Sequence, residues 1–334
     1  MGSNNEIKVT IIGTGSYLPE KVLTNRDLER IVDTSDEWIV TRTGIKERRI
    51  SSPEQAASDL GTEAAKNALE NAKISPEELD AIIVATITPD MFFPSTGCII
   101  QNNLGAKKAF ALDLNAACSG FIYALAVAYS FLKAKLCSKI LVVASEVLSK
   151  ITDWQDRNTC VLLGDGAGAA VLSATTEKDP PKQILSIFLA SQGEYGDLLN
   201  MPAGGSRIPA SVESVKNRLH FLKMKGKEVF RIAVISMLEA ARRGLEMCNT
   251  SLDKLKLLIP HQANIRIINA IGERLGLSSE QVYVNVDRYG NMSAATVAVA
   301  LDEVTKSNKL NRGDIVELVA FGAGFTSGSC VIQW

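Results

Sequence analysis

The feature that most constrains this chain is an internal repeat. The segment Glu63–Glu70 matches Glu239–Glu246 at five of eight positions, and a sixth pair is Lys against Arg. The offset is 176 residues (239 − 63), and it continues without a gap into an apolar stretch of each half. A period this long indicates a duplicated unit. We therefore expect two similar halves, 1–178 and 179–334, on either side of the linker at Pro180-Pro181.

Short apolar runs alternate with amphipathic segments along both halves, which predicts an α/β protein with mostly parallel sheets. At the same offset Cys118 corresponds to Ala294 and Asn115 to Asn291, and both pairs lie just past predicted strands. His261 also follows a predicted strand. Because open α/β sheets bind ligands outside the carboxyl ends of their strands, we expect Cys118, His261 and Asn291 to converge on one site.

Cys118 is the residue around which the candidate site is built. An extended run, 109–114, leads into small residues and then into a nearly uncharged segment, 118–132, which predicts a helix buried on all sides. The first turn of a helix favours a thiolate over a thiol, since backbone N–H groups point outward there. Taken alone, Cys118 is more often a small buried apolar residue, and only its convergence with His261 and Asn291 favours catalysis.

The composition excludes several classes of site and partner. The six cysteines form no C-x-x-C pair, which predicts a reduced protein without disulfides or a zinc site. The two histidines, His220 and His261, are too few for a multi-histidine metal centre, so we expect no metal. A net charge of −1 gives no reason to expect nucleic acid.

The N-terminal segment does not change this interpretation. No apolar run reaches the length of a membrane span and no signal-peptide pattern is present, so we expect a cytoplasmic protein that does not bind membranes. Gly13-Thr-Gly15 follows a predicted strand, but Leu18 stands where a dinucleotide fingerprint needs its third glycine. We interpret this segment as a strand and a turn.

Four motifs in order resemble one known family. They are Asn115-Ala-Ala-Cys118-Ser-Gly, Pro260-His261-Gln-Ala-Asn264, Tyr289-Gly-Asn291-Met-Ser-Ala-Ala and Phe321-Gly-Ala-Gly-Phe-Thr326. Together they resemble 3-oxoacyl-[acyl-carrier-protein] synthase III, the initiating condensing enzyme of type II fatty acid synthesis. The resemblance runs from Ile11 to the end of the chain and implies a duplicated thiolase fold in a layered αβαβα arrangement.

The resemblance implies a reaction and three catalytic residues. Cys118 would take the acetyl group from acetyl-CoA, and malonyl-acyl carrier protein would then lose CO2 and attack it, giving acetoacetyl-acyl carrier protein. His261 and Asn291 would stabilise the enolate oxygen. The backbone N–H groups of Cys118 and Ala323 would form the oxyanion hole, although the family often has glycine at 323. Acyl-CoA and the carrier protein are substrates, and no cofactor is expected.

The resemblance also implies substrate contacts. Trp38, Arg42 and Arg157 would hold the nucleotide of coenzyme A, since an indole face and guanidinium groups suit an adenine and its phosphates. The pantetheine would pass Lys227, Ala263 and Asn264, although asparagine is commoner in the family at 227. Phe93 is similar to the residue that closes the acyl pocket from a second subunit, which implies a homodimer and a short primer.

A basic run, 216–231, contains six Lys or Arg residues against a single acid, Glu228. Such a run is usually a solvated face, but an acidic carrier protein has to dock on this protein. Arg231, Arg266 and Arg274, together with Gln262, resemble the family's docking positions. Docking of this kind would depend on salt.

Two other functions stay open. One is a specialised acyltransferase or starter synthase of secondary metabolism with the same three residues. The other is a non-catalytic thiolase-fold binding protein, which would not be acylated at Cys118. Elongating condensing enzymes use two histidines, and here Asn291 takes the second place. Thiolases use a second cysteine, but Cys330 lies within a predicted strand and we interpret it as core.

Overall fold

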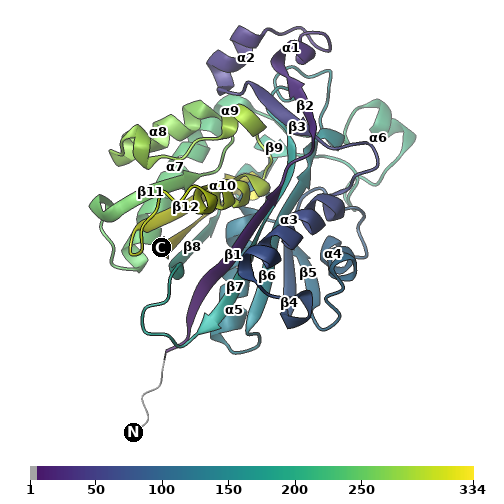
Figure 1. Ribbon diagram of the computed structural model, residues 1–334. Helices are drawn as coiled ribbons and strands as arrows, with labels where there is room; N and C mark the ends of the chain where they lie inside the picture. The colour runs from purple at the N-terminus through teal and green to yellow at the C-terminus, as the bar shows by residue number, and fades with distance from the viewer. Residues whose placement is uncertain (1–5) are drawn as a thin grey trace.

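The computed structural model describes residues 6–334, and at its centre is one nine-stranded sheet (Figure 1). The strands run in the order β11-β12-β13-β8-β1-β7-β6-β4-β5. Their bounds, in this order, are Leu255–Pro260, Ile315–Gly322, Thr326–Gln333, Gln183–Ser191, Lys8–Tyr17, Asp165–Thr175, Lys139–Val147, Ala81–Ala85 and Phe110–Leu114. Two small sheets stand apart from it, built from β2 (Lys21–Thr24) with β3 (Glu47–Ile50) and from β9 (Leu199–Asn200) with β10 (Lys223–Met224).

The expectation of mostly parallel sheets is wrong. In the central sheet β4 pairs parallel with β5 and β6, and β11 pairs parallel with β12. The other five pairings are antiparallel. For the β12–β13 pair the reason lies in the connection, because neighbours joined by a short turn must be antiparallel whereas parallel neighbours need a crossover. β12 and β13 are joined by the three residues Ala323–Phe325, whereas α4 (Thr96–Leu104) lies between β4 and β5.

The elements of the second part of the chain follow the first at nearly constant spacing. β4, α5 and β6 begin at Ala81, Gly120 and Lys139. β11, α10 and β12 begin 174, 175 and 176 residues later (255 − 81, 295 − 120, 315 − 139). Even a left-handed residue recurs after the long helix of each part, Lys73 with φ 55° and Asn249 with φ 54°. The division into 1–178 and 179–334 stays our proposal.

Helices and sheet form five layers, because alternate residues of the strands face opposite ways. On β4, Ile83 and Ala85 pack in a central cluster with helices α5 (Gly120–Lys133) and α10 (Ala295–Lys306). Ile82 and Val84 face the other way, toward α3 (Ala57–Ala72).

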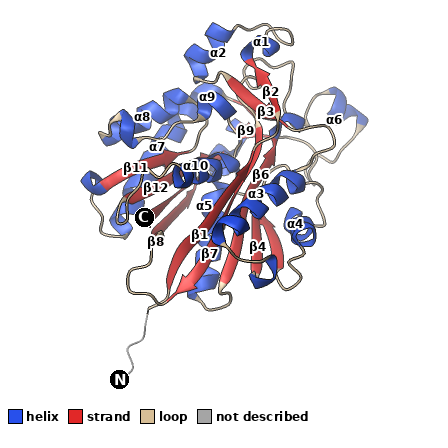
Figure 2. Cartoon of the chain, in the orientation of Figure 1, coloured by secondary structure: helices blue, strands red, loops and turns tan. Residues whose placement is uncertain are grey.

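The second part of the chain repeats this alternation. On β12, Leu318 and Ala320 belong to the same central cluster, while Val319 packs on α7 (Gly226–Met247) and α8 (Ile265–Leu275). The result is the expected αβαβα order, with the sheet visible between helices in Figure 2.

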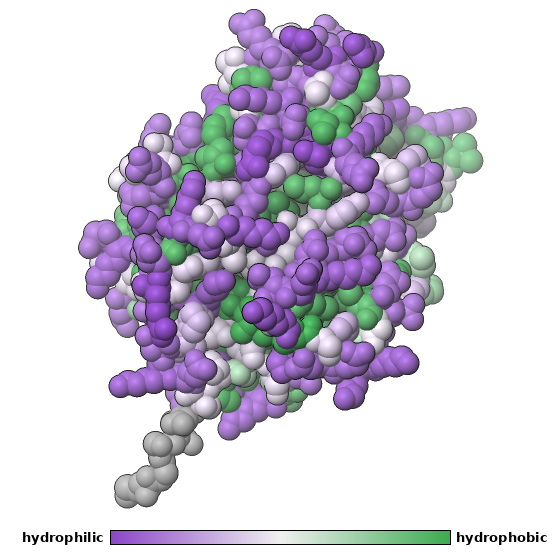
Figure 3. All heavy atoms as spheres, in the orientation of Figure 1, coloured by the Kyte–Doolittle hydropathy of each residue, from purple (hydrophilic) through white to green (hydrophobic). Residues whose placement is uncertain are grey.

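Smaller elements gather at one end of the sheet. Helices α1 (Asn25–Leu28) and α2 (Asp36–Thr43) cap that end, α9 (Val286–Tyr289) lies beneath them, and α6 (Val212–Lys216) projects to the side (Figure 1). The surface in this view is mostly hydrophilic, with small apolar patches between the charged side chains (Figure 3). No helix in the described part of the chain is long and apolar enough to cross a membrane.

The helix after Cys118 differs from expectation in two ways. α5 begins at Gly120, and Cys118 itself lies in a short 3-10 turn, Ala117–Ser119. Nor is the helix buried on all sides. Ser130 is exposed and Val127 is only partly buried. The reason is that α5 packs on the strands with one side, whereas the side with Val127 and Ser130 is not fully covered within residues 6–334.

Glu317 is an acid in the core of the second part. It lies on β12 at the position that corresponds to Leu141, and neither carboxylate oxygen has a hydrogen-bond partner within residues 6–334. Burial therefore raises the pKa of Glu317 well above its usual value. The folded protein holds this carboxyl protonated while the unfolded chain ionises at an ordinary pKa, so stability falls as pH rises between the two values.

We expect Glu317→Gln to gain stability over the wild type as the pH is raised from 5 to 8. The gain should grow by up to about 1.4 kcal/mol per pH unit until the native carboxyl ionises. Denaturant unfolding at both pH values measures it. Glu239→Gln, an exposed change on α7, is the matched control and should follow the wild type. A gain from Glu317→Gln that is the same at both pH values would contradict the argument.

Candidate active site

Cys118 lies on a sharp elbow between β5 and α5. The Oδ1 of Asn115 accepts a hydrogen bond from the N–H of Ala117 at 3.2 Å, and Ala117 has a left-handed backbone with φ 47°. A residue other than glycine in this region is strained and persists only where its surroundings hold it. β5 ends at Leu114, and the elbow places Cys118 just before the first turn of α5.

Asn291 lies on an elbow of the same geometry. Its Oδ1 accepts from the N–H of Ser293 at 2.8 Å, and Ser293 also has φ 47°. Ser293 lies 176 residues after Ala117 (293 − 117), so the repeat extends to the strained residue itself. Because the side-chain oxygen is occupied, the amide Nδ2 is the group that Asn291 can offer as a donor, and it has no protein acceptor within residues 6–334.

His261 directly follows β11 and is buried. Its N–H donates to the carbonyl of Val319 at 2.8 Å, and its Nδ1 lies 2.6 Å from the Oγ1 of Thr296. The Thr296 hydroxyl donates its one proton to the carbonyl of Ser293 at 2.9 Å, so it accepts from His261 Nδ1–H. Nε2 therefore carries a lone pair. Burial lowers the pKa of His261 to about 3, which makes the ring neutral at physiological pH.

The structure brings Cys118, His261 and Asn291 to one cavity of about 120 Å³. Its remaining wall is largely apolar and is formed by residues from the 199–237 region, from the segment that follows β11 and from the end of β12, among them Leu199, Val229, Ala233, Met237, Ala263, Ile267 and Phe321. A thiol, an imidazole and an amide donor on one largely apolar cavity suit attack on a thioester and stabilisation of the charge that follows.

The expectation that the position of Cys118 favours a thiolate is wrong for the resting protein. The side chain keeps some exposed surface, but burial raises the pKa of the Cys118 thiol to about 12. The Ser293 hydroxyl lowers it in part, and the nearby Glu146 carboxylate raises it further. Desolvation outweighs the helix end because Cys118 precedes α5 and faces an apolar cavity. The resting residue is a neutral thiol.

The backbone around Cys118 contains an unusually close approach. A Cβ added to Gly322 would come within 2.6 Å of the Cys118 nitrogen. Gly322 ends β12, and Ala323 follows it in a 3-10 turn. Within residues 6–334 the N–H groups of Cys118 and Ala323 have no backbone acceptor outside their own short turns. The pair thus suits an oxyanion hole, and only a glycine at 322 allows the strand end to come this near.

A second cavity of about 600 Å³ opens to the surface beside the first. The two share five lining residues, Leu162, Met224, Gly226, Phe230 and Asn264, and so form one passage from the surface to Cys118. At its outer end the guanidinium groups of Arg42 and Arg157 each lie 4.7 Å from the centre of the Trp38 ring. Arg157 also pairs with Asp33 at 3.2 Å. An aromatic face with cations suits a nucleotide.

The other residues expected to contact substrate fall into two groups. Lys227 is exposed on the outer cavity, and Ala263 lines the inner one. Asn264 lines both, caps α8 and donates to the Arg42 carbonyl at 3.0 Å. Phe93 is different, because its side chain is 84% exposed and it does not line the Cys118 cavity within this one chain.

Gln262 does not fit the docking role expected from its sequence position. Its side chain is fully buried, donates to the carbonyls of Pro260 and Tyr283, and accepts from the N–H of Asn285. These hydrogen bonds link the end of β11, next to His261, to the 283–286 segment. Because the side chain is buried, it cannot contact a carrier protein. Arg231, Arg266 and Arg274, in contrast, are all exposed on α7 and α8.

Part of the basic run 216–231 is structural. Arg218 hydrogen-bonds Asp153, Lys223 pairs with the same carboxylate at 3.3 Å, and the Arg218 bond lowers the pKa of Asp153 to about 2. His220 bonds Ser214 at 2.9 Å and does not line the Cys118 cavity. Two of the six basic residues thus tie the loop before α7 to the loop at Asp153.

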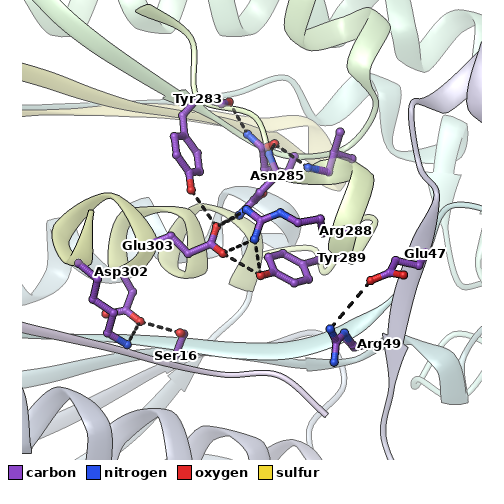
Figure 4. Close-up of polar contacts among 12 residues, drawn as sticks. Ser16, Glu47, Arg49, Tyr283, Asn285, Arg288, Tyr289, Asp302 and Glu303 are labelled. Carbon is purple, nitrogen blue, oxygen red and sulfur yellow. Dashed lines mark hydrogen bonds and ion pairs between the residues drawn. The ribbon is translucent and has the colours of Figure 1, made fainter. Parts of the chain in front are cut away.

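Sequence reasoning missed the residues that hold the site in place. Besides Thr296 and Ser293, Glu303 of α10 anchors the segment that leads to Asn291. Its carboxylate accepts from Tyr283 at 2.9 Å, Asn285 at 2.7 Å, Arg288 at 2.9 Å and Tyr289 at 2.7 Å (Figure 4). A single helical glutamate gives no signal in the sequence, because its partners come from the loop that it organises.

Known proteins resemble the whole chain. The family model for 3-oxoacyl-[acyl-carrier-protein] synthase III matches residues 112–193, and the model for the C-terminal part of that synthase matches 245–334. A curated relative from Caldanaerobacter subterraneus subsp. tengcongensis, named beta-ketoacyl-[acyl-carrier-protein] synthase III, is 56% identical over 98% of both chains.

Solved structures agree with these relatives. The crystal structure of 3-oxoacyl-[acyl-carrier-protein] synthase III from Aquifex aeolicus VF5 covers 98% of this chain and 100% of its own, with 48% identity and a TM-score of 0.89. The priming beta-ketosynthase of the R1128 polyketide pathway covers 100% and 98%, with 34% identity and a TM-score of 0.90.

We expect Gly322→Ala to slow acetyl transfer from acetyl-CoA to the protein by about 10²-fold or more, because the added methyl displaces an oxyanion-hole N–H. The rate is measured by mass spectrometry of the intact protein. Ala323→Gly is the matched control, since it removes a methyl one residue away and keeps the N–H, and it should stay within a few-fold of the wild type. Gly322→Ala at the wild-type rate, in a protein with unchanged thermal unfolding, would contradict the assignment.

Proposed function

The chain belongs to the 3-oxoacyl-[acyl-carrier-protein] synthase III family, condensing acyltransferases of fatty acid biosynthesis, and on this premise we propose how its own residues carry out the reaction. The substrates that we propose are acetyl-CoA and malonyl-acyl carrier protein, and the products are coenzyme A, CO2 and acetoacetyl-acyl carrier protein. The observation that carries the proposal is the single cavity lined by Cys118, His261 and Asn291.

The first half-reaction transfers the acetyl group to Cys118. The neutral thiol passes its proton to the Nε2 lone pair of His261 as sulfur attacks the thioester carbonyl. The carbonyl oxygen becomes an oxyanion and receives the N–H groups of Cys118 and Ala323. When the tetrahedral intermediate collapses, the coenzyme A thiolate leaves and takes the proton back from His261. The products are acetyl-Cys118 and neutral coenzyme A.

The second half-reaction needs donors at a different oxygen. Loss of CO2 from the malonyl group leaves an enolate, whose oxygen receives the Nδ2–H of Asn291 and the Nε2–H of His261. The resting tautomer of His261 has no proton on Nε2. In the other tautomer the ring has exchanged its proton with solvent, losing it from Nδ1 and gaining it at Nε2, and the Thr296 hydroxyl accommodates this because its proton can turn from the Ser293 carbonyl to the Nδ1 lone pair. Thr296 thus allows one histidine to serve both half-reactions.

The bond-forming step returns to the oxyanion hole. The enolate carbon attacks the acetyl carbonyl, and the new oxyanion lies again at the N–H groups of Cys118 and Ala323. This attack forms the carbon–carbon bond, and collapse of the oxyanion breaks the carbon–sulfur bond and expels the Cys118 thiolate, which takes a proton from solvent. The passage past Met224 and Asn264 would hold the pantetheine arm of each substrate, with the adenine of acetyl-CoA at Trp38.

A homodimer is part of the proposal, and the support is an uncovered sheet edge. β5 is the last strand of the sheet, pairs only with β4 within residues 6–334, and carries Phe110 half-exposed. Nearby in sequence, Met91, Phe92 and Phe93 are all exposed. Exposed edges and aromatic clusters of this kind are usually covered. A second copy would cover them and bring its own Phe93 to a short-chain acyl pocket. We place the protein in the cytoplasm.

We expect the two half-reactions to separate by mutation. Cys118→Ser should give no acetyl adduct after incubation with acetyl-CoA. Asn291→Ala should lose malonyl-carrier-protein decarboxylation by about 10²-fold or more while acetyl transfer stays within a few-fold, because Asn291 donates only to the enolate. Mass spectrometry of the protein and release of labelled CO2 measure the two steps. Acetylation of Cys118→Ser at a residue other than position 118 would refute the role of Cys118 as nucleophile. Equal loss of both steps in Asn291→Ala would refute the role of Asn291 as enolate donor.

We also expect the exposed arginines to act on the carrier protein alone. The double variant Arg231→Ala with Arg274→Ala should raise the KM for malonyl-carrier protein about three- to tenfold, since each surface charge contributes modestly. The KM for acetyl-CoA should not change. Arg243→Ala, exposed on the same helix and paired with Glu246, is the control. Equal effects of the double variant and the control, or no steeper salt dependence for the carrier protein than for acetyl-CoA, would remove the docking proposal.

A further inference from the structure

Glu146 is a buried acid that the reaction scheme above does not use. It lies on β6 with no exposed surface, and three donors reach its Oε2. They are the Thr86 hydroxyl at 3.3 Å, the Ile87 N–H at 3.1 Å and the Thr88 hydroxyl at 2.8 Å. Its Oε1 is buried and has no hydrogen-bond partner within residues 6–334. A buried acceptor without a partner is costly, and this one lies next to the active site.

Ser293 is a second buried polar residue beside the active site. Its Oγ also has no completed hydrogen bond within the described residues. The fold brings it near both the Cys118 thiol and the Glu146 carboxyl. A Cβ on Gly120, two residues after Cys118, would lie 3.4 Å from Ala294, which follows Ser293, and 3.0 Å from Ala85, which precedes the Thr86 that bonds Glu146. In agreement with this placement, the Ser293 hydroxyl lowers the pKa of both groups. Since Oε2 of Glu146 is taken by three donors, Oε1 is the oxygen left to meet the Ser293 hydroxyl. The elbow strain at Ser293 holds this hydroxyl in place.

We propose that Glu146 and Ser293 are positioning residues for Cys118, in which the carboxyl of Glu146 directs the one proton of the Ser293 hydroxyl either toward the Cys118 sulfur or away from it. The inference rests on the proposed role of Cys118 as the nucleophile. It concerns a part of the reaction that the three catalytic residues leave open, namely what stabilises the sulfur anion when it attacks and again when it leaves.

The protonation state of Glu146 decides which way the Ser293 proton points, because it decides whether Oε1 donates or accepts a hydrogen bond. Protonated Glu146 donates from Oε1 to Ser293 Oγ, so the Ser293 proton points to sulfur and stabilises the thiolate. Ionised Glu146 instead accepts the Ser293 proton and also repels a thiolate directly. Burial raises the pKa of Glu146, the donors of Thr88, Ile87 and Ser293 and the N–H of Ala294 lower it, and burial outweighs them and brings the pKa to about 7. Both forms are therefore populated near neutral pH.

The groups around this carboxyl leave Cys118 as its titratable partner. Other acids on the elements packed against β6 are engaged elsewhere: Asp165 of β7 with Ser51 and Ser149, Asp302 of α10 with Thr14 and Ser16, and Asp59 of α3 with the N–H of Ala56. On α10, Glu303 binds the 283–289 segment, and on α5 the Tyr123 hydroxyl binds the carbonyl of Ala190. The pKa of Cys118 is the one that Glu146 is seen to shift.

Two conservative variants isolate the proposed contact. In Glu146→Gln the amide oxygen must take the Oε2 place, because three donors converge there, so its NH2 faces Ser293 as protonated Glu146 would. The variant thus fixes the thiolate-stabilising arrangement at every pH. Ser293→Ala removes the hydroxyl, and alanine tolerates the backbone, since Ala117 has the same φ of 47° on the other elbow.

The experiment is the rate of Cys118 alkylation by iodoacetamide in the full-length protein between pH 6 and 9, followed by peptide mass spectrometry. Exposed Cys98 in the same samples is the internal reference. We expect Glu146→Gln to alkylate Cys118 about tenfold faster than the wild type at pH 8.5, which corresponds to one unit of thiol pKa. The ratio should shrink toward pH 6, where wild-type Glu146 is protonated. Ser293→Ala should be slower than the wild type.

The double variant tests whether Glu146 acts on Cys118 through the Ser293 hydroxyl. With Ser293→Ala present, adding Glu146→Gln should change the alkylation rate by much less than tenfold. No acceleration in Glu146→Gln, an acceleration independent of pH, or an undiminished acceleration in the double variant would each overturn the proposal. If Glu146→Gln fails to fold by thermal unfolding, Ser293→Ala alone still decides at pH 6, where the Ser293 proton points to sulfur, since an alkylation rate equal to the wild type at that pH would overturn the proposal.

The alkylation readout does not depend on the proposed reaction. If Cys118 alkylates as described but takes no acetyl group from acetyl-CoA, the proposed function fails and the positioning of the thiol stands. If acetyl transfer occurs and the alkylation pattern is absent, the positioning fails alone.

Discussion

The structure depends on a strained backbone turn that occurs twice. At Ala117 and at Ser293 the chain has φ 47°, and in each case an asparagine two residues earlier holds the turn through its side-chain oxygen. The first turn leads from the end of β5 into α5, and the second leads from Asn291, which forms an isolated bridge with Leu163 after α9, into α10; both helices belong to the central layer. The two helices meet where they start, since a Cβ on Gly120 would lie 3.4 Å from that of Ala294. Because the two elbows share one geometry, Cys118 and Asn291 arrive at the same cavity from opposite parts of the chain.

Burial sets the electrostatics of this cavity. The thiol of Cys118 has a pKa raised to about 12 and the imidazole of His261 has one lowered to about 3, both chiefly through desolvation. A thiolate–imidazolium pair is therefore absent at rest, and charge appears only during reaction. Dipoles that are already oriented, such as the N–H groups beside Gly322 and the amide of Asn291, stabilise such charge without having to reorganise. The same burial gives the few polar groups behind the cavity, Thr296, Ser293 and Glu146, their weight in the proposed scheme.

Much of this could be predicted from the sequence, because some signals are local. The repeat of Glu63–Glu70 predicted the paired helices, and apolar runs predicted the strands. The expected places of the motif residues after strands predicted the meeting of Cys118, His261 and Asn291. The place was right for Cys118 and His261 and wrong for Asn291, which follows the short helix α9. Strand direction could not be predicted, because it depends on which neighbours a connection joins. Gln262 was expected at the docking surface and is buried instead. Sequence could not show this, because its four hydrogen bonds involve segments that the fold brings together.

The two elbows have the same backbone geometry but differ in their side chains. Where the first has alanine at 117 and cysteine at 118, the second has Ser293 and Ala294. The small residue at 294 leaves room at Gly120, and the hydroxyl at 293 is the feature that the first elbow lacks. A duplicated strained turn can thus be divided into two tasks. In the proposed scheme one copy presents the nucleophile, and the other presents an amide donor from Asn291 and the Ser293 hydroxyl that we propose acts on that nucleophile. Because both copies keep φ 47°, this division needed changes of side chain and none of the backbone.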